Sequence, residues 1–525
     1  MDCATQRTDA ANESIAADVR RCHPRCGKSL RPVDCVRHTP RRSRSHKATY
    51  RVDQRGSRQV EARVRHDGGL EMRQRVWFFQ PRTEAKANYS NGAGKEQTWT
   101  PWFACYLASA ARALGLTPHL IDARVDSDWL ATVRTLGPED ILAVSVMTGA
   151  AITDSIKAST VARDNGSYVV WGGPHVTLFP AQTLEQSPAD AVIPGFGYAG
   201  LSLLLHRLTG VPMPHTASAP VVLAKGEEPP TSSMFNILRQ SPNRDAGGLV
   251  AAPDNLPDLD LISNWEPYVN PDLAIAPRTL NYVTSEGCLR RCTFCSEPQT
   301  SGNSWYVRRV ELAIDRIREM VGRASASGLK LHDPNFFHDG ERAQLFGDLL
   351  AEQVGIPWAA SLHPADLTDM SDGALSAAAD SGLCRVLMGL ETPVPELVKL
   401  AGKRYDPSRI PEMATRLARV GVRGMFTFIV GWPGAAPDHY QQTIDAAYRI
   451  RELWSEHQCK IHFLEPWPGT PIYTMLRRKG FPYPDSLEEW ARVDYYQAQY
   501  AELHDSRYTD IIRQANSELS PYVDA

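Results

Sequence analysis

The chain has 525 residues, of which 42% are hydrophobic and 22% charged, and this length predicts two or three domains. A formal net charge of −3 excludes a general attraction to nucleic acid or to anionic membranes, so we expect neither as a partner. The sequence has no apolar run of about eighteen residues and no apolar signal-peptide core, which indicates a cytoplasmic protein with reduced thiols.

Residues 1–71 are rich in Arg, Ser, Asp and Thr and lack a periodic apolar face, so we expect a disordered, Arg-rich extension. Cys22, Cys26, Cys35 and His38 form a candidate zinc site, but their spacing is loose and no apolar residues surround them. Met72 stands immediately before the first expected strand. An upstream addition to the reading frame is therefore an alternative interpretation of this segment.

Residues 72–212 alternate short apolar runs with segments of helical periodicity, the pattern of a parallel sheet with crossover helices. Strands are expected at 75–80, 118–123, 141–147, 168–173 and 190–195. Helices are expected at 101–115, 127–137, 150–166 and 199–210. The sequence thus predicts an α/β fold that begins with a five-stranded, doubly wound, Rossmann-like domain.

Small residues follow three successive strands of this domain, in "SVMTG", "GGPH" and "GFGY". Doubly wound sheets bind ligands at the carboxyl ends of their strands, and glycine lets a backbone approach a ligand closely. Tight turns alone are the alternative explanation for each glycine. The candidate ligand-binding residues are Ser145, Thr148, Gly172, Gly173, His175, Gly195 and Gly197.

Residues 213–275 are rich in Pro, Asn and Asp and are expected to form a linker. A second alternation covers 276–480, with strands expected at 279–287, 328–337, 356–364, 384–392, 422–434 and 460–469. Six strand–helix units are too few for a closed eight-stranded barrel, so we expect an open, partial (β/α)6 barrel with functional residues at the strand ends. Residues 481–525 are expected to be a helical tail, whose Tyr495, Tyr496 and Tyr500 either line a substrate cavity or pack onto the barrel.

Cys288, Cys292 and Cys295 form a C-x3-C-x2-C pattern directly after the first strand of the second domain. A closed structural zinc site needs four ligands, and His332 or His338 would have to supply the fourth. A [4Fe–4S] cluster on three thiolates instead leaves one iron open to another ligand. The pattern favours a catalytic cluster, with structural zinc and a simple electron-transfer cluster as alternatives.

This cysteine pattern, with Phe294 before the last cysteine, resembles that of the radical S-adenosylmethionine (SAM) superfamily. "DPNFF" (333–337), "MGLET" (388–392), "IVGWPG" (429–434) and "PWPGTPIY" (466–473) are similar to its strand-end turns. The segments 101–122 and "GGPHVT" (172–177) resemble the cobalamin-binding domain that precedes many of these enzymes.

The sequence departs from that family at three places. Gly195-Phe196-Gly197-Tyr198 replaces the usual GEGE, and Ala435 replaces the glutamate after Pro433-Gly434. The D-x-H-x-x-G string of other corrinoid proteins is absent, which implies that cobalt has no such histidine below it.

The resemblance implies three cofactors: a [4Fe–4S] cluster, SAM and methylcobalamin. Cys288, Cys292 and Cys295 would be the catalytic iron ligands. Phe294 would lie near the adenine, and Glu391 would bind the ribose or the amine. Gly431, Pro433 and Gly434 would form a further cofactor-binding turn. Asp333, Asn335, Ser361 and His363, at neighbouring strand ends, are candidates to contact substrate or cofactor.

The resemblance also implies an enzyme that methylates an unactivated carbon, or phosphorus, of a small metabolite in natural-product biosynthesis. Its electron donor would be a flavodoxin or a ferredoxin. Two alternatives stay open: an oxidative cyclase or ring-rearranging enzyme with the same cofactors, and a non-enzymatic corrinoid-binding protein.

Overall fold

The computed structural model describes residues 75–83, 98–212, 221–226, 249–251, 256–493 and 503–520. All of them lie in one compact unit, Leu70–Ala525. The expected extension 1–71 with its candidate zinc ligands, most of the expected linker, and Tyr495, Tyr496 and Tyr500 lie outside the described residues. Among the described residues, no helix is long and apolar enough to cross a membrane.

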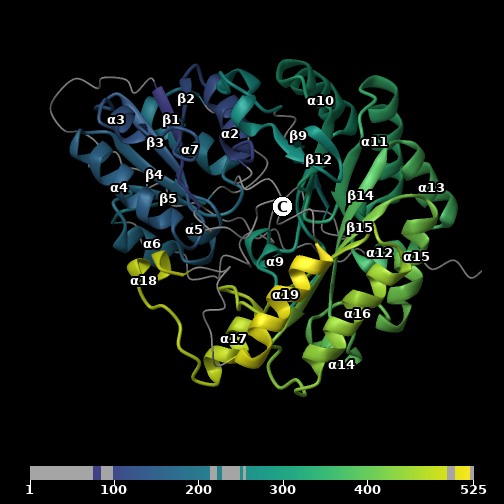
Figure 1. Cartoon of the computed structure of the whole chain (residues 1–525). Coiled ribbons are helices and arrows are strands. Elements are labelled where there is room, and N and C mark those ends of the chain that lie inside the picture. Colours follow the sequence, from purple (N-terminus) through teal and green to yellow (C-terminus); the bar gives the residue numbers. More distant parts are fainter. Residues whose placement is uncertain are drawn as a thin grey trace, which may run out of the picture. The chain divides into compact units, whose positions relative to one another are not determined.

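The first sheet has the strand order β2-β1-β3-β4-β5-β6 (Figure 1). Its strands are β1 (Arg75–Gln80), β2 (Thr117–Asp122), β3 (Asp140–Ser145), β4 (Tyr168–Gly172), β5 (Ala191–Ile193) and β6 (Leu223–Ala224). The first five are parallel, which confirms the expected doubly wound domain, and the short β6 pairs antiparallel with β5. Strand β6 is additional to the five strands expected from the sequence.

Helices cover both faces of this sheet. They are α2 (Trp102–Ala113), α3 (Trp129–Val133), α4 (Ala151–Asp164), α5 (Pro174–Leu178), α6 (Pro180–Gln186) and α7 (Tyr198–Thr209). In β3, Ile141 and Ala143 pack in the core with α2 and α7, whereas Leu142 and Val144 pack in the core with α3 and α4. A strand buried on both faces must be apolar throughout, which explains the continuous apolar runs of the sequence.

The second sheet has the order β16-β15-β14-β13-β12-β9-β8. Its strands are β8 (Asn270–Asp272), β9 (Ala276–Tyr282), β12 (Gly328–Leu331), β13 (Trp358–Ser361), β14 (Leu383–Glu391), β15 (Arg423–Val430) and β16 (Gln458–Phe463). The six strands from β9 to β16 are parallel and form the expected partial barrel, with β8 added antiparallel to β9. β9, β12, β13, β15 and β16 all end before the expected residues, and the loops that follow them contribute to the site.

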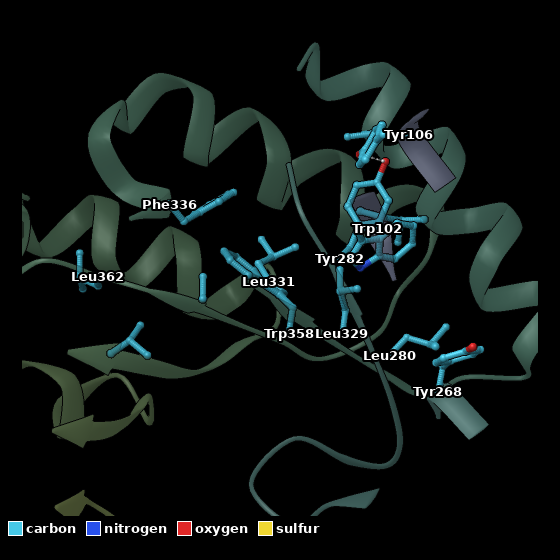
Figure 2. Packing of buried hydrophobic residues seen from close by; sticks show 14 of the residues in the cluster. Trp102, Tyr106, Tyr268, Leu280, Tyr282, Leu329, Leu331, Phe336, Trp358 and Leu362 are labelled. Carbon is cyan, nitrogen blue, oxygen red and sulfur yellow. Dashed lines mark hydrogen bonds between the residues drawn. The ribbon is translucent and has the colours of Figure 1, made fainter. Parts of the chain in front are cut away.

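The helices of this domain pack on the outer face of the sheet. They are α10 (Val310–Ala324), α11 (Gly340–Gln353), α12 (Pro364–Asp369), α13 (Asp372–Asp380), α14 (Pro395–Leu400), α15 (Ile410–Arg419), α16 (His439–Leu453) and α17 (Pro471–Arg478). Trp358 and Ala360 of β13 and Leu362 directly after it belong to the buried core, and Figure 2 shows Trp358 beside Leu331 and Leu329 of β12. Because side chains alternate along a strand, Ser361 and His363 face the inner side.

The two domains share one apolar core. Trp102 Nε1–H of α2 donates to Asn281 Oδ1 at 2.7 Å, and the hydroxyls of Tyr106 and Tyr282 are 3.2 Å apart (Figure 2). Tyr268 donates to Asp122 Oδ2 at 3.0 Å. The first domain is therefore packed directly against β9, the strand that leads to the cysteines.

A third sheet and several short helices complete the described fold. The third sheet contains β7 (Leu249–Ala251), β10 (Ser285–Gly287) and β11 (Trp305–Val307). The short helices are α9 (Glu297–Thr300), η1 (Leu259–Leu261), η2 (Glu266–Tyr268), η3 (Phe336–His338), η4 (Pro407–Arg409) and η5 (Ser506–Tyr508).

The expected helical tail contributes to both domains through α18 (Leu487–Ala491) and α19 (Thr509–Leu519). Helix α18 lies against α4 and α6, where Trp490 joins the core of the first domain (Figure 1). In α19, the Asn516 side chain accepts from the backbone N–H of Ile461 at 2.8 Å and donates to the Ile461 carbonyl at 2.9 Å. These bonds satisfy backbone groups of the edge strand β16.

Candidate active site

The exit of β9 into the cysteine loop is held by Asp333. Its carboxylate accepts hydrogen bonds from Thr284 N–H (2.8 Å), Thr284 Oγ1 (2.6 Å) and Ser285 Oγ (2.5 Å). Burial raises the pKa of Asp333, although these donors and Arg342 act in the opposite direction. Gly287 has a φ of 82°, and a Cβ there would lie 2.1 Å from the Ser304 carbonyl oxygen. Asp333 therefore fixes the backbone where β9 leads into the cysteine loop. Its position at a strand end had suggested a contact with substrate or cofactor instead.

The three cysteines of the loop are free thiols. Cys288 Sγ lies 3.4 Å from His338 Nε2, whereas the ring of His332 packs against Trp99. Burial raises the pKa of Cys288 to about 12 and also raises the pKa values of Cys292 and Cys295. Metal binding must therefore displace thiol protons.

Three thiols on one loop at a strand end are the donor set of a [4Fe–4S] cluster with an open iron. Within the described ranges, no group of three or more His, Cys, Asp or Glu side chains is arranged to hold a metal ion. Each thiolate of a [4Fe–4S] cluster binds a different iron, so these three sulfurs do not have to converge on a single ion.

Backbone contacts tie the cysteine loop to two other strand ends. Thr293 N–H donates to the Ala401 carbonyl (2.9 Å), and the Thr293 carbonyl accepts from Ile472 N–H (3.1 Å) at the start of α17. Gly402 has a φ of 70°, and a Cβ there would lie 2.7 Å from the Arg291 carbonyl oxygen. The loop is thereby positioned beside the segment that follows β14.

That segment brings a buried ion pair to the cysteines. Glu391 has a φ of 67°, rare for a residue other than glycine, and its carboxylate is 2.8 Å from Lys403 Nζ. Burial opposes the charge of Lys403, but Glu391 and Cys292 raise its pKa overall. Lys403 Nζ also lies 6.0 Å from the Phe294 ring, which packs edge-on against Trp432. Lys403 thus lies beside both Glu391 and Phe294 of the cysteine loop, and no spacing signal in the sequence pointed to Lys403.

The predicted turn after β15 has two different surroundings. Gly431 has a φ of 81°, and a Cβ there would meet His504 at 2.9 Å, so this glycine lies against the C-terminal segment. Gly434 has a φ of 78° with nothing within 4 Å of an added Cβ, and Pro433 stands between the two glycines. The structure therefore leaves space around Gly434 but not around Gly431.

His363 presents a buried donor on the inner face of the barrel. Its Nδ1 accepts from Ala365 N–H at 3.1 Å, so the ring proton is on Nε2. Nε2 is buried without a hydrogen-bond partner among the described residues, and the residue is only 9% exposed. Asn335 fixes the backbone of His363 and donates to Asp366, which pairs with Arg290 of the cysteine loop. A ligand acceptor at this position would satisfy the donor.

A cavity of about 240 Å³ lies at the carboxyl ends of β3, β4 and β5. Five of the expected residues line it: Ser145, Gly172, Gly173, Gly195 and Gly197. Apolar side chains such as Phe103 and Leu107 form much of the remaining wall. Glu286, Glu297 and Thr300 of the second domain also line it, and the sequence analysis had identified none of these three.

Thr177 joins two of the glycine turns. Its hydroxyl donates to the Gly173 carbonyl at 2.9 Å and accepts from Gly195 N–H at 2.8 Å. Thr148 and His175 are not among the residues that line the cavity. Instead, Thr148 Oγ1 and His175 Nδ1 are 3.0 Å apart, and burial lowers the pKa of His175 to about 4. Thr148 and His175 thus form a hydrogen bond with each other outside the cavity wall, and their contact with a ligand stays a prediction.

The rim of the cavity carries a carboxylate from the second domain. Tyr198, at the position of the last glutamate in GEGE, donates to Glu286 Oε2 at 2.8 Å. Arg308 donates to both groups, at 2.8 and 2.7 Å, and its guanidinium lies 3.8 Å from the centre of the Tyr106 ring. The first domain lacks this glutamate, and a carboxylate from the other domain is bound to the tyrosine that replaces it.

Comparison with known proteins identifies both domains. Residues 93–204 match the family model of the B12 binding domain, and residues 282–447 match that of the radical SAM superfamily. The order of the two domains is the one expected from the sequence.

Three curated relatives match most of the chain. An uncharacterised methyltransferase of Pyrococcus horikoshii is 24% identical over 72% of this chain and 78% of its own length. The cytidylyl-2-hydroxyethylphosphonate methyltransferase of Streptomyces wedmorensis is 23% identical over 71% and 72%. The anaerobic magnesium-protoporphyrin IX monomethyl ester cyclase of Cereibacter sphaeroides is 24% identical, and the match covers 77% of this chain but only 64% of the cyclase.

Two solved structures share the fold. The radical SAM methyltransferase TsrM from Kitasatospora setae, with cobalamin and a [4Fe–4S] cluster bound, has a TM-score of 0.61 at 16% identity and covers 78% of each chain. The cobalamin-dependent radical enzyme OxsB, with aqua-cobalamin and SAM bound, has a TM-score of 0.56 at 15% identity and covers 80% of this chain and 64% of OxsB. The chain is therefore a radical SAM enzyme that carries a B12-binding domain in front of its radical SAM domain.

Proposed function

We propose that this enzyme is a cobalamin-dependent radical SAM methyltransferase that acts on an unactivated carbon, or phosphorus, of a small metabolite. One observation carries the proposal: the cavity of the B12-binding domain is completed by Glu286 and Glu297. Glu286 precedes Cys288 by two residues, and Glu297 follows Cys295 by two residues. A corrinoid held by the first domain would therefore lie next to the cysteine loop.

In this proposal each domain supplies one set of contacts. Cys288, Cys292 and Cys295 hold the cluster, and Glu391, Phe294, Gly431, Pro433 and Gly434 hold SAM. Ser145, Gly172, Gly173, Gly195 and Gly197 hold cobalamin. When bound, these cofactors supply hydrogen abstraction by a radical and a transferable methyl group. The chain positions them, and the shared core around Trp102, Tyr106 and Tyr282 keeps the two sites at a defined separation.

The relatives support methyl transfer and keep one alternative in place. Two of the three relatives described above are methyltransferases by name. The cyclase relative matches 77% of this chain, which supports oxidative cyclisation with the same cofactors as the second candidate function. We further propose a reduced flavodoxin or ferredoxin as electron donor, no nucleic acid partner, and a cytoplasmic location, where the thiols would stay reduced. The boundaries 72–212 and 276–480 remain our prediction for the two domains.

The test uses the full chain, reconstituted anaerobically and supplied with methyl-labelled SAM, a reductant and a metabolite library. A methyltransferase of this type should give labelled product, deoxyadenosine and S-adenosylhomocysteine in near-equal amounts. Deoxyadenosine with an unlabelled product would favour the cyclase alternative. Bound cobalamin with none of these products would favour a non-enzymatic corrinoid-binding protein.

A further inference from the structure

The strands of the second sheet contain only two carboxylates, and both are already paired. Asp272 binds Arg385 at 2.8 Å, and Glu391 binds Lys403 at the same distance. Lys330 on β12 is different, because no hydrogen bond or ion pair links its ammonium to another residue in the described part of the chain. The sheet therefore carries a cation that its own carboxylates do not balance.

Lys330 points to the inner side of the barrel. Its neighbours Leu329 and Leu331 are buried in the outer core, so alternation along β12 directs Lys330 and His332 inward. Lys330 Nζ lies 5.9 Å from the centre of the Trp99 ring, and that ring stacks edge-on with His332 at 4.0 Å. Trp99 is 40% exposed. An aromatic ring and an imidazole thus flank a half-buried ammonium.

The inner face of the sheet also exposes an apolar side chain, Leu387, two strands away from Lys330. Leu387 belongs to β14, which is paired on both sides by β13 and β15, yet it is 40% exposed. Its neighbours Val386 and Met388 are completely buried in the outer core, so the exposed surface of Leu387 lies on the inner face. The inner face at Leu387 is therefore partly open to solvent.

We infer that this inner face binds an oxyanion of the substrate, a carboxylate or a phosphoryl group, at Lys330, beside the Trp99 ring that packs on His332. The inference rests on the proposed function and adds the substrate class: an anionic metabolite. A half-buried ammonium without an acceptor is costly, and an anionic ligand removes that cost. Burial lowers the pKa of Lys330 only to about 8, so the amine is still mostly protonated at neutral pH. Leu387 offers apolar contact to the remainder of the ligand.

The test measures binding by calorimetry on the reconstituted full chain, without turnover. The probes are methylphosphonate and acetate, with acetamide as the neutral analogue. We expect the oxyanions to bind and acetamide not to bind, and the stronger of the two oxyanions identifies the group. Lys330→Met should weaken oxyanion binding about tenfold or more, because it removes a hydrogen bond to a charged group. Lys330→Arg should retain oxyanion binding, because the positive charge is kept. This result would show that the site tolerates a substitution at this position.

Lys157→Met is the matched control, since Lys157 is an exposed lysine that also lies near a tryptophan ring, 5.8 Å from Trp129. Equal binding of acetamide, no binding of either oxyanion, or equal losses in the Lys157 and Lys330 variants would overturn the inference. These outcomes do not depend on methyl transfer, so a failed labelling assay would count against the proposed function and not against the anion site. Conversely, methyl transfer to a neutral metabolite would overturn the anion site and leave the proposed function intact.

Discussion

Replacing Gly173 by alanine should weaken cobalamin binding by more than tenfold while the cluster still forms. Gly173 lies at the start of α5 with φ 98° and ψ −178°, a conformation that is essentially restricted to glycine. An alanine Cβ there would stand 2.7 Å from Val146 N and 2.9 Å from Val146 O. Both Val146 atoms are engaged, since Val146 N–H donates to Gly172 O and Val146 O accepts from His175 N–H. The backbone cannot withdraw without breaking those bonds.

The expected cost follows from these contacts. The backbone conformation costs a residue other than glycine about 1–3 kcal/mol, and each lost backbone hydrogen bond about 0.5–1.5 kcal/mol more. With both Val146 hydrogen bonds lost the total is about 2–6 kcal/mol, and because the bound state requires the native turn, cobalamin affinity falls by more than tenfold. Gly115 is the matched control because it has φ 75° but nothing within 4 Å of an added Cβ. Gly115→Ala should therefore carry the backbone strain alone.

The assay compares three full-length variants after anaerobic reconstitution. Bound cobalamin is measured by absorbance after gel filtration, and iron and sulfide are measured on the same samples. Gly137→Ala, with ordinary φ and open space, should behave as the parent chain. Cobalamin binding by Gly173→Ala at the parental affinity would refute the reasoning. An equal loss in Gly115→Ala would refute the role of the Val146 contact.

Three further predictions concern the cluster, the ion pair and the buried histidine. Cys292→Ala should remove most of the iron and all deoxyadenosine formation, whereas Cys459→Ala, at a core residue, should leave the iron content unchanged. Zinc without sulfide in the parent chain would contradict this prediction. Lys403→Met should lower the free energy of unfolding by about 3–5 kcal/mol, because Glu391 is left buried and unpaired. The double variant Lys403→Met/Glu391→Gln should recover most of this stability, and additive losses would argue against the pairing. Burial lowers the pKa of His175 to about 4, so its stabilising contribution should be complete above pH 6.5 and disappear as the pH falls to about 4. The unfolding free energies of the parent and of His175→Gln should therefore converge in acid, and parallel pH profiles would contradict this.

Features encoded by contiguous residues could be predicted from the sequence. The succession of strands and helices in each domain, the two-domain division and the Cys288, Cys292 and Cys295 loop all follow from local periodicity and spacing, whereas the order of the strands in each sheet was not predicted. Gly173 was also identified from its motif, but for a different reason: the expected conflict was with a ligand, whereas the structure shows that the nearest atoms belong to the backbone of Val146. A motif indicates that glycine is required without indicating what it contacts.

Contacts between distant segments were decided only by the tertiary structure. Tyr198 and Glu286 are separated by 88 residues, and Lys403 meets Glu391 only because a bulge turns the end of β14. Trp490 completes the core of a domain that ends far before it in the chain. Such pairs leave no periodic or spacing signal, because long-range packing fixes which loops meet. Lys330 shows the same limit. The sequence predicts that it lies on a strand, but only the tertiary structure shows that the carboxylates of Asp272 and Glu391 pair with Arg385 and Lys403 instead.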